Sequence, residues 1–314
     1  MYYLGIDLGG TNIAVGLVNE ELALVCKDSL PTPATDPVAI ADTMAVLCRR
    51  LLKKEGLSFD DVAYAGIACP GIVNRASGEV IYANNINFDH FPLAHLLCER
   101  MPLKAVYLEN DANAAALGEA KAGGARGTKN SVMITLGTGV GGGIIIDGKV
   151  YMGFNCAGGE LGHMVIQKDG RPCTCGRRGC FEAYSSATGL VRMTQEKMEA
   201  RPDSLMHELV RRHGKVSGRT AFGAERAGDE AGAEVVAEYV SYLACGISNL
   251  INIFQPEALV IGGGVCNEKE NLLNRLYPIV RREAYGGGRV PATELRIAEL
   301  GNDAGIIGAA CLGL

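Results

Sequence analysis

Four residues within a short stretch have side chains that bind transition metals: His163, Cys173, Cys175 and Cys180. One imidazole and three thiolates complete the tetrahedral shell of a structural zinc ion and leave no position for a reactive water. Glycine and proline surround the cysteines, which indicates a loop in which the thiols would be exposed without a ligand. The pattern therefore predicts a zinc ion that shapes the chain and takes no part in a reaction.

The other cysteines have a simpler interpretation. The chain contains 11 cysteines in 314 residues, and a free cysteine often serves as a small buried apolar side chain. Outside the cluster we favour this interpretation for Cys26, Cys48, Cys69, Cys98, Cys245, Cys266 and Cys311.

Two carboxylates flank the proposed metal loop. Glu160 stands three residues before His163, and Glu182 stands two residues after Cys180. A rigid metal knot would hold both carboxylates in place.

A glycine turn near the start of the chain is a candidate phosphate site. The apolar run Tyr2–Leu8 is followed by Gly9, Gly10, Thr11 and Asn12, and residues 13–18 again have strand character, which predicts a β-hairpin. Glycine allows successive N–H groups to surround a phosphate, and the two polar residues add donors. Asp7 could hold hydrated Mg²⁺ near the same phosphates. An ordinary tight turn is the alternative.

The same device recurs after Ser131–Leu136. Gly137, Thr138 and Gly139 begin a glycine-rich segment, and strand character resumes at 144–146. Two such hairpins, about one domain length apart, suggest two related lobes that hold one polyphosphate. The sequence GxxxxGK[ST] is absent.

A third glycine turn follows the short apolar strand 258–261 and contains Gly263 and Gly264. Ligands of α/β sheets bind beyond the carboxyl ends of strands, so this turn is a candidate for the nucleoside end. A strand-to-helix turn without ligand is the alternative.

The segments between these turns alternate between strand and helix. Helices are expected at Pro37–Lys54, Leu93–Arg100, 112–122 and 231–254, and strands at 62–68 and 105–108. Residues 302–310 begin with capping side chains and continue with small residues that permit close helix packing. Residues 201–230 resemble a mobile connection between helices. The order predicts an α/β fold with hairpin additions.

Composition narrows the class of protein. The length suggests two domains. The net charge is −5 and no block of Lys or Arg is longer than a short pair, so nucleic acid is not an expected partner. The charge-free, glycine-rich run 131–146 is shorter than a bilayer-spanning helix requires. We see no secretory signal and expect a cytoplasmic protein without a membrane segment.

Taken together, the motifs DLGGTN, ENDANAAALGE, TLGTGVGGG, ELGH, CTCGRRGCFE, VIGGGV and DAGIIGAA resemble the ROK family of sugar kinases and sugar-responsive repressors. The resemblance spans almost the whole chain. It implies a two-lobed actin-like ATPase (ribonuclease H-like) fold, each lobe with a βββαβα core and a cleft between them. The lobes are expected at 1–116 with 302–314, and at 117–301.

The resemblance also implies roles for individual residues. Asp111 corresponds to the general base that accepts the hydroxyl proton, although an Asp at a helix start is more commonly an N-cap. The implied sugar ligands are Gly71, Asn84, Asn85, Asn110, Asp111, Glu160, His163 and Glu182. ATP, Mg²⁺ and a structural Zn²⁺ are the implied cofactors.

The implied function is an ATP-dependent hexose kinase, foremost a glucokinase. Kinases for N-acetylmannosamine, fructose or allose share the scaffold. A sugar-responsive repressor is the alternative from another class, but the first strand begins at Tyr2 and leaves no room for a preceding helix-turn-helix region. A zinc-stabilised sugar-binding protein without catalysis is the third. A homodimer or higher homo-oligomer is expected, and the apolar residues of 231–254 supply either a dimer face or core.

Overall fold

The computed structural model describes residues 1–33, 36–83 and 86–314. The chain folds into two compact units. Unit 1 comprises residues 1–130, 143–159 and 299–314, and unit 2 comprises residues 131–142 and 160–298. The expected lobe boundaries, 1–116 with 302–314 and 117–301, stay a prediction. The compact units differ from them because the helix over Asp111–Ala122 lies wholly in unit 1 and is not divided at residue 116.

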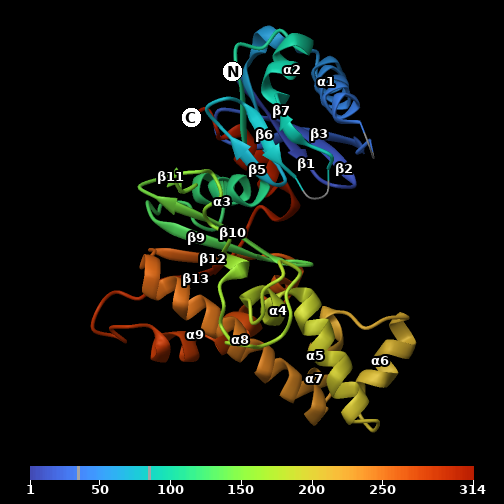
Figure 1. The fold of residues 1–314 in the computed structure, drawn as a ribbon, viewed down its shortest axis with the longest axis vertical. Coiled ribbons are helices and arrows are strands. Elements are labelled where there is room, and N and C mark those ends of the chain that lie inside the picture. The colour runs from blue at the N-terminus through green and yellow to red at the C-terminus, as the bar shows by residue number, and fades with distance from the viewer. Residues whose placement is uncertain (34–35, 84–85) are drawn as a thin grey trace. The chain divides into compact units, whose positions relative to one another are not determined.

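A five-stranded sheet forms the centre of unit 1 (Figure 1). In spatial order its strands are β3 (Leu24–Pro31), β2 (Asn12–Val18), β1 (Tyr2–Leu8), β4 (Val62–Cys69) and β8 (Val106–Asn110). The β1–β2 pair is antiparallel, which confirms the first hairpin, and β1, β4 and β8 run parallel. The carboxyl ends of β1 and β8 therefore lie at the same edge of the sheet.

Helices and a small second sheet complete unit 1. Helices α1 (Pro37–Lys54) and α2 (Leu93–Arg100) begin and end at the expected residues. Buried residues of both helices pack with the buried residues of β1, β2 and β4 in one core. The small sheet consists of β5 (Ile72–Asn74), β6 (Glu79–Tyr82) and β7 (Asp89–Phe91). Cys98 lies on the outer side of α2 and is exposed, contrary to expectation, whereas Cys48 in α1 is buried.

Close packing of two helices depends on small residues. Helix α3 spans Asp111–Ala122, and helix α10 spans Ala304–Ala310. A Cβ added to Gly308 would lie 1.7 Å from the carbonyl oxygen of Ala114, so only glycine permits this approach. Asp303 does not cap α10 with its side chain as expected. Its carboxylate instead forms an ion pair with Lys27 at 2.5 Å.

The second five-stranded sheet has the same order as the first. Its strands are β11 (Lys149–Val150), β10 (Val140–Ile146), β9 (Ser131–Leu136), β12 (Ala258–Gly262) and β13 (Glu294–Ile297). Strands β9, β12 and β13 are parallel, and β10 pairs with β11 antiparallel. β10 begins at Val140, earlier than the expected residue 144, because its glycines take part in the strand.

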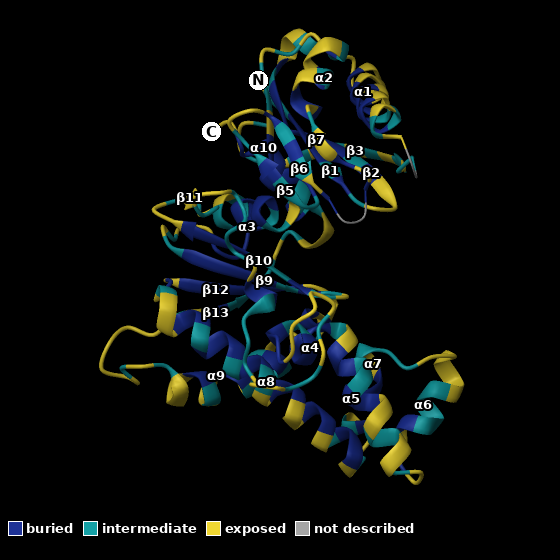
Figure 2. Ribbon diagram, viewed as in Figure 1, coloured by how far each residue is buried: buried dark blue, intermediate teal, exposed yellow. Residues whose placement is uncertain are grey.

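The helices of unit 2 are α4 (Phe181–Ser185), α5 (Ala187–Ala200), α6 (Met206–His213), α7 (Gly218–Arg226), α8 (Glu230–Phe254) and α9 (Glu270–Glu283). Strands β9 and β12 are almost entirely buried (Figure 2). Much of α8 is buried too. Core burial within the chain therefore accounts for most apolar residues of 231–254.

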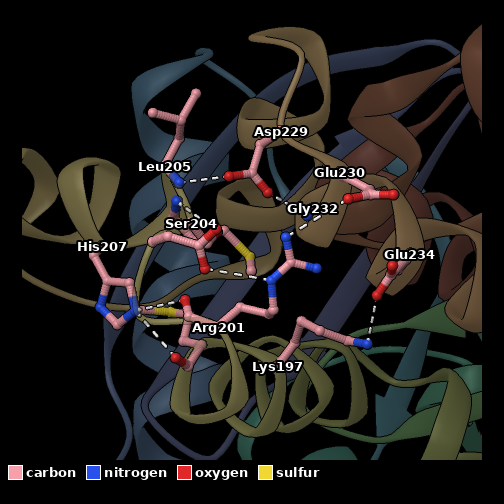
Figure 3. A network of polar contacts seen from close by, with 12 residues as sticks. Lys197, Arg201, Ser204, Leu205, His207, Asp229, Glu230, Gly232 and Glu234 are labelled. Carbon is pink, nitrogen blue, oxygen red and sulfur yellow. Dashed lines mark hydrogen bonds and ion pairs between the residues drawn. The ribbon is translucent and has the colours of Figure 1, made fainter.

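Residues 201–230 form two helices, α6 and α7, and the expected mobile connection is wrong (Figure 1). Polar contacts join the end of α5 to the start of α8 (Figure 3). Lys197 pairs with Glu234 at 2.7 Å, and Arg201 pairs with Glu230 at 3.6 Å. The Asp229 carboxylate accepts hydrogen bonds from the N–H groups of Leu205 and Gly232. The Asp229 carboxylate thus satisfies backbone N–H groups at the starts of α6 and α8. The sequence pattern does not reveal these helix ends.

In the part of the chain that the structure describes, no helix is long and apolar enough to cross a membrane.

Candidate active site and metal centre

The four expected metal ligands come together in unit 2. One ligand atom from each of His163, Cys173, Cys175 and Cys180 lies within 4.8 Å of the other three. The Cys173 Sγ lies 3.6 Å from the His163 Nδ1, and the Cys175 Sγ lies 3.7 Å from the Cys180 Sγ. Tetrahedral zinc with bonds of about 2.3 Å to sulfur and about 2.1 Å to nitrogen requires ligand separations of about 3.8 Å and 3.6 Å. The donor set and its spacing therefore fit zinc.

Backbone geometry explains why the loop folds in this way. Gly179 has φ +80°, and a Cβ there would lie 1.7 Å from the carbonyl oxygen of Gln167. Isolated β-bridges join Val165 to Cys180 and Pro172 to Arg178. Cys180 then directly precedes α4. The loop is thus closed by backbone pairing, and its last thiol is fixed at the start of a helix.

The protein environment affects the thiols differently. Burial raises the pKa of Cys180, and the adjacent thiols add to this effect. Cys175 is exposed, and a hydrogen bond from the Arg177 N–H lowers its pKa. Zinc binds the thiolate form of cysteine. Cys175 loses its proton more readily than Cys180 does.

The two carboxylates beside the metal loop have different surroundings. Glu160 is exposed and precedes the short 3₁₀ helix Leu161–His163. Glu182 is half-buried, and its Oε2 accepts a hydrogen bond of 3.0 Å from the Val140 N–H. Its Oε1 accepts a bond of 3.3 Å from the hydroxyl of Thr174 in the metal loop. Glu182 thus joins the metal loop to the glycine segment of the β9–β10 connection.

Two of the expected nucleotide loops adjoin each other in unit 2. Gly263 has φ +91°, and a Cβ there would lie 2.4 Å from the carbonyl oxygen of Leu136, directly before Gly137. The start of α5 supports the first loop: the Ala187 N–H donates to the Gly137 carbonyl, and the Thr188 hydroxyl donates to the Thr138 carbonyl. A Cβ at Gly139 would lie 2.2 Å from the Glu182 Oε2. Gly264 begins a 3₁₀ helix that spans Gly264–Glu268.

The first glycine turn lies in unit 1 and is fixed by its backbone. The Gly9 N–H donates to the Asn12 carbonyl at 3.0 Å. Thr32 supports the turn from the end of β3, because its hydroxyl donates to Gly9 and its N–H donates to Thr11. Gly10, Thr11 and Asn12 are exposed. Their donors are therefore available to a ligand.

Asp111 lies at the start of α3, and the structure answers the question of its capping role. The N-cap is Asn110, whose Oδ1 accepts hydrogen bonds from the N–H groups of Ala112 and Asn113 at 3.0 and 3.2 Å. Asp111 is the first helical residue, so the expected capping role of this aspartate is wrong. Its Oδ1 accepts from the Ala112 N–H at 2.8 Å, and the side chain remains exposed.

The side chain of Asn110 already makes hydrogen bonds within the protein. Besides capping α3, its Nδ2 donates to the Gly71 carbonyl at 3.0 Å. Gly71 has φ +94°, and a Cβ there would lie 2.1 Å from the carbonyl oxygen of Tyr82. A sugar ligand at Asn110 would have one remaining amide hydrogen to use. The two other expected sugar ligands, Asn84 and Asn85, lie outside the described residues.

Asp7 and Asp111 influence each other electrostatically. Burial raises the pKa of Asp7 to about 6, and the negative charge of Asp111 contributes. Burial also raises the pKa of Asp111, and a hydrogen bond from the Ala112 N–H offsets part of this effect. Part of the Asp111 side chain is exposed to solvent. The protein around the carboxyl group still displaces enough water to favour its protonated form. A cation or a proton donor would therefore be attracted to this pair.

Sequence reasoning missed Glu109 and Arg75. Glu109 is buried with 1% of its side chain exposed, and its Oε2 lies 3.3 Å from the Arg75 Nη1. Its Oε1 accepts from the Asn110 N–H and the Asn113 Nδ2. The only signal was a charged residue directly after the apolar strand residues 105–108.

The structure thus brings the expected residues together in two groups, one in each unit. Unit 1 holds Asp7, the turn Gly9 to Asn12, Gly71, Asn110 and Asp111. Unit 2 holds the metal ligands, Glu160, Glu182 and the loops at 137–139 and 263–264.

Two sheets of identical strand order, with glycine turns beside their parallel strands, place the fold in the actin-like ATPase class. The chain belongs to the ROK family, whose model matches residues 3–314.

Curated relatives and solved structures agree with this assignment. A glucokinase from Halalkalibacterium halodurans is 39% identical over 311 residues, with 98% of this chain and 93% of the relative covered. A glucokinase from Streptomyces coelicolor is 37% identical, with coverage of 98% and 96%. The crystal structure of a ROK family glucokinase from Streptomyces griseus in complex with glucose and AMPPNP matches with a TM-score of 0.80 and 35% identity, covering 99% of this chain and 98% of that one.

Proposed function

We propose that this protein is an ATP-dependent glucokinase that converts D-glucose and ATP to glucose 6-phosphate and ADP. Full-length similarity to glucokinases supports the activity. The observation that carries the proposal is Asp111, an exposed carboxylate at the sheet edge whose capping role is taken by Asn110. Asp111 is therefore free to accept a proton.

In the proposed reaction, Asp111 accepts the proton of the sugar 6-hydroxyl. The hydroxyl oxygen forms a bond to the γ-phosphorus of ATP, and the bond from that phosphorus to the β,γ-bridging oxygen breaks, so ADP leaves. A general base contributes about 10²–10⁴ in rate, and positioning and charge neutralisation supply the rest. The raised pKa of Asp111 makes its carboxylate a better base than an ordinary aspartate.

Each group of residues contains proposed ligands for sugar hydroxyl groups. In unit 2, Glu160 and Glu182 offer carboxylate acceptors. The His163 Nε2 remains available for the sugar, because its Nδ1 faces Cys173. In unit 1, Gly71 and Asn110 stay proposed ligands, and Asn84 and Asn85 are further candidates.

The polyphosphate of ATP would be bound by backbone N–H groups of the loops at Gly9 to Asn12 and Gly137 to Gly139, and the nucleoside by Gly263 and Gly264. Mg²⁺ bound near Asp7 would neutralise phosphate charge, and a carboxylate oxygen suits that ion. Zinc on His163, Cys173, Cys175 and Cys180 would be structural, because four protein ligands complete its shell.

A cytoplasmic location and a homodimer or higher homo-oligomer stay predictions. Ile253 near the end of α8 is 64% exposed, so part of that helix has apolar surface for a partner.

The experiment is a panel of hexoses with ATP and saturating Mg²⁺, scored by ADP release. Glucose is expected to give the highest kcat/KM, above N-acetylmannosamine, fructose and allose. A higher kcat/KM with another hexose would correct the substrate. Sugar binding without ADP release for any hexose would favour a sugar sensor and contradict the kinase.

A further inference from the structure

An ion pair between Arg75 and the buried Glu109 adjoins the start of α3, where the proposed base Asp111 lies. Arg75 follows β5, and Glu109 is the residue of β8 that pairs with Ala68 of β4. The Arg75 Nη1 and the Glu109 Oε2 are 3.3 Å apart, and the exposed fractions of their side chains are 30% and 1%. Burial raises the pKa of Glu109, and the Asn110 N–H and the Arg75 guanidinium offset part of this effect. Arg75 therefore stabilises a carboxylate that the core alone would disfavour.

The other oxygen of Glu109 holds the start of α3. Its Oε1 accepts the Asn110 N–H at 2.9 Å and the Asn113 Nδ2 at 3.1 Å. Asn110 and Asn113 stand on either side of Asp111 and Ala112 in the first turn of the helix. Asn110 in turn caps the helix through its Oδ1. One carboxylate thus binds the backbone N–H directly before Asp111 and the side chain of Asn113 after it.

The segment from Gly71 to Arg75 is attached to the same junction at two points. At one end the Asn110 Nδ2 donates to the Gly71 carbonyl at 3.0 Å. At the other end Arg75 pairs with Glu109. This segment holds a proposed sugar ligand, and the junction holds the proposed base. A shift of the pair would therefore move both the base and one wall of the sugar site.

We propose that the Arg75–Glu109 ion pair is a positioning device that sets the relative placement of Asp111 and the Gly71 segment. The proposal rests on the proposed function for its kinetic part. Neither residue needs to touch the substrate. Glu109 acts through Asn110 and Asn113, and Arg75 acts by holding Glu109 ionised and in place.

The first test is Glu109→Gln. The glutamine amide has one acceptor oxygen and one donor NH₂ group. The NH₂ group must therefore face either the two donors from Asn110 and Asn113 or the Arg75 guanidinium. We expect kcat with glucose to fall on the order of 10- to 100-fold, because a small misplacement of a reacting group has that effect. KM for the sugar should rise several-fold, on the order of 3-fold or more, while KM for ATP stays within about 2-fold of the parent.

Two Arg75 variants separate charge from packing. Arg75→Lys keeps the positive charge and should retain more activity than Arg75→Met. The double variant Arg75→Met with Glu109→Gln removes the donor facing the new amide, so its kcat should exceed that of Glu109→Gln alone. A double variant as impaired as the product of the single effects would overturn the coupling.

The matched control is Glu119→Gln. Glu119 is a fully buried glutamate at the other end of α3, and its carboxylate accepts backbone N–H groups of Gly124, Glu299 and Leu300. Its variant should lower the melting temperature and leave both KM values and kcat per folded molecule unchanged. If Glu109→Gln behaved in the same way, the role of Glu109 would be stability alone, and the proposal would be wrong.

A readout without catalysis keeps this inference separate from the proposed function. Hydrogen exchange at the amides of Ala112 and Asn113 should be faster in Glu109→Gln than in the parent and unchanged in Glu119→Gln. Unchanged exchange in Glu109→Gln would overturn the positioning role. If the parent failed to phosphorylate any hexose, the kinase assignment would fail, and the exchange result would still decide the positioning role.

Discussion

The surroundings of Asp111 and Asp7 give these two aspartates properties that their residue type alone does not. Asn110 performs the capping that an aspartate at a helix start usually provides. Burial favours the protonated form of both carboxyls, and the charge of Asp111 adds to the effect at Asp7. The site therefore contains charge that the fold destabilises and that a cation would stabilise.

The raised pKa of Asp7 predicts the effect of Asp7→Asn on stability. This pKa is raised from 3.8 to about 6 in the folded chain. The favourable contribution of Asp7 to folding is therefore complete below about pH 4 and is lost as the pH rises through about 6. In the absence of nucleotide and divalent cation, Asp7→Asn should be more stable than the parent by about 1–2 kcal/mol at pH 7, and this difference should shrink toward pH 4.

Denaturant unfolding at several pH values measures this difference. The control is Asp28→Asn, because Arg50 lowers the pKa of Asp28 through a side-chain hydrogen bond and the substitution should not stabilise the protein at pH 7. An Asp7→Asn variant that is no more stable than the parent at pH 7 would show that the folded chain does not disfavour the Asp7 carboxylate.

Residue types and spacing were sufficient to predict that the four candidate metal ligands lie together, because soft donors gathered in one glycine-rich loop are typical of a zinc site. The cap was not predictable, because Asn110 and Asp111 are both good capping residues and only the backbone angles decide between them. Glu109 and Arg75 were missed for a related reason. They are 34 positions apart in sequence, and no local pattern indicates that they pair.

At the scale of elements, loops and short helices connect the metal loop to the proposed nucleotide loop. Glu182 accepts hydrogen bonds from Val140 and Thr174, and α4, which carries Glu182, begins directly after Cys180. Zinc bound at the cluster would therefore stiffen more than its own loop.

We predict about one zinc ion per chain in the purified protein. Cys175→Ser should lower the zinc content and the melting temperature, the latter by about 5 °C or more, because metal binding contributes directly to folding. Elemental analysis and thermal unfolding measure both quantities. Cys98→Ser provides the control, since Cys98 is an exposed cysteine outside the cluster and its loss should leave the zinc content unchanged. A metal-free parent, or a Cys175→Ser variant with full zinc content, would refute the site.

Elements with clear periodicity and clear boundary residues were predicted well, and the others were not. Helices α1 and α2 match their expected bounds because apolar periodicity and boundary residues agree. The prediction for residues 201–230 was wrong because the helices there depend on tertiary contacts such as those of Asp229. The predicted start of β10 was also wrong. Glycine normally weakens a strand, and here three glycines lie within one.

At the scale of the whole molecule, the two five-stranded sheets have the same order and the same pattern of parallel strands. The sequence indicated this repetition through its two glycine hairpins. Membership of the ROK family agrees with it. The sequence alone left the choice of sugar open, because epimers differ only in the direction of one hydroxyl, and side-chain placement decides which one is bound.

In the proposed reaction, the Asp111 carboxylate accepts the proton of a sugar hydroxyl during phosphoryl transfer from ATP. The most direct measurement is glucose-dependent ADP release by Asp111→Asn compared with the parent, with Asp36→Asn as the control because Asp36 is the N-cap of α1. We predict that Asp111→Asn lowers kcat by about 10²–10⁴-fold with KM for ATP nearly unchanged, and that Asp36→Asn retains the parental kcat. Phosphorylation of glucose by Asp111→Asn at the parental rate would contradict the account.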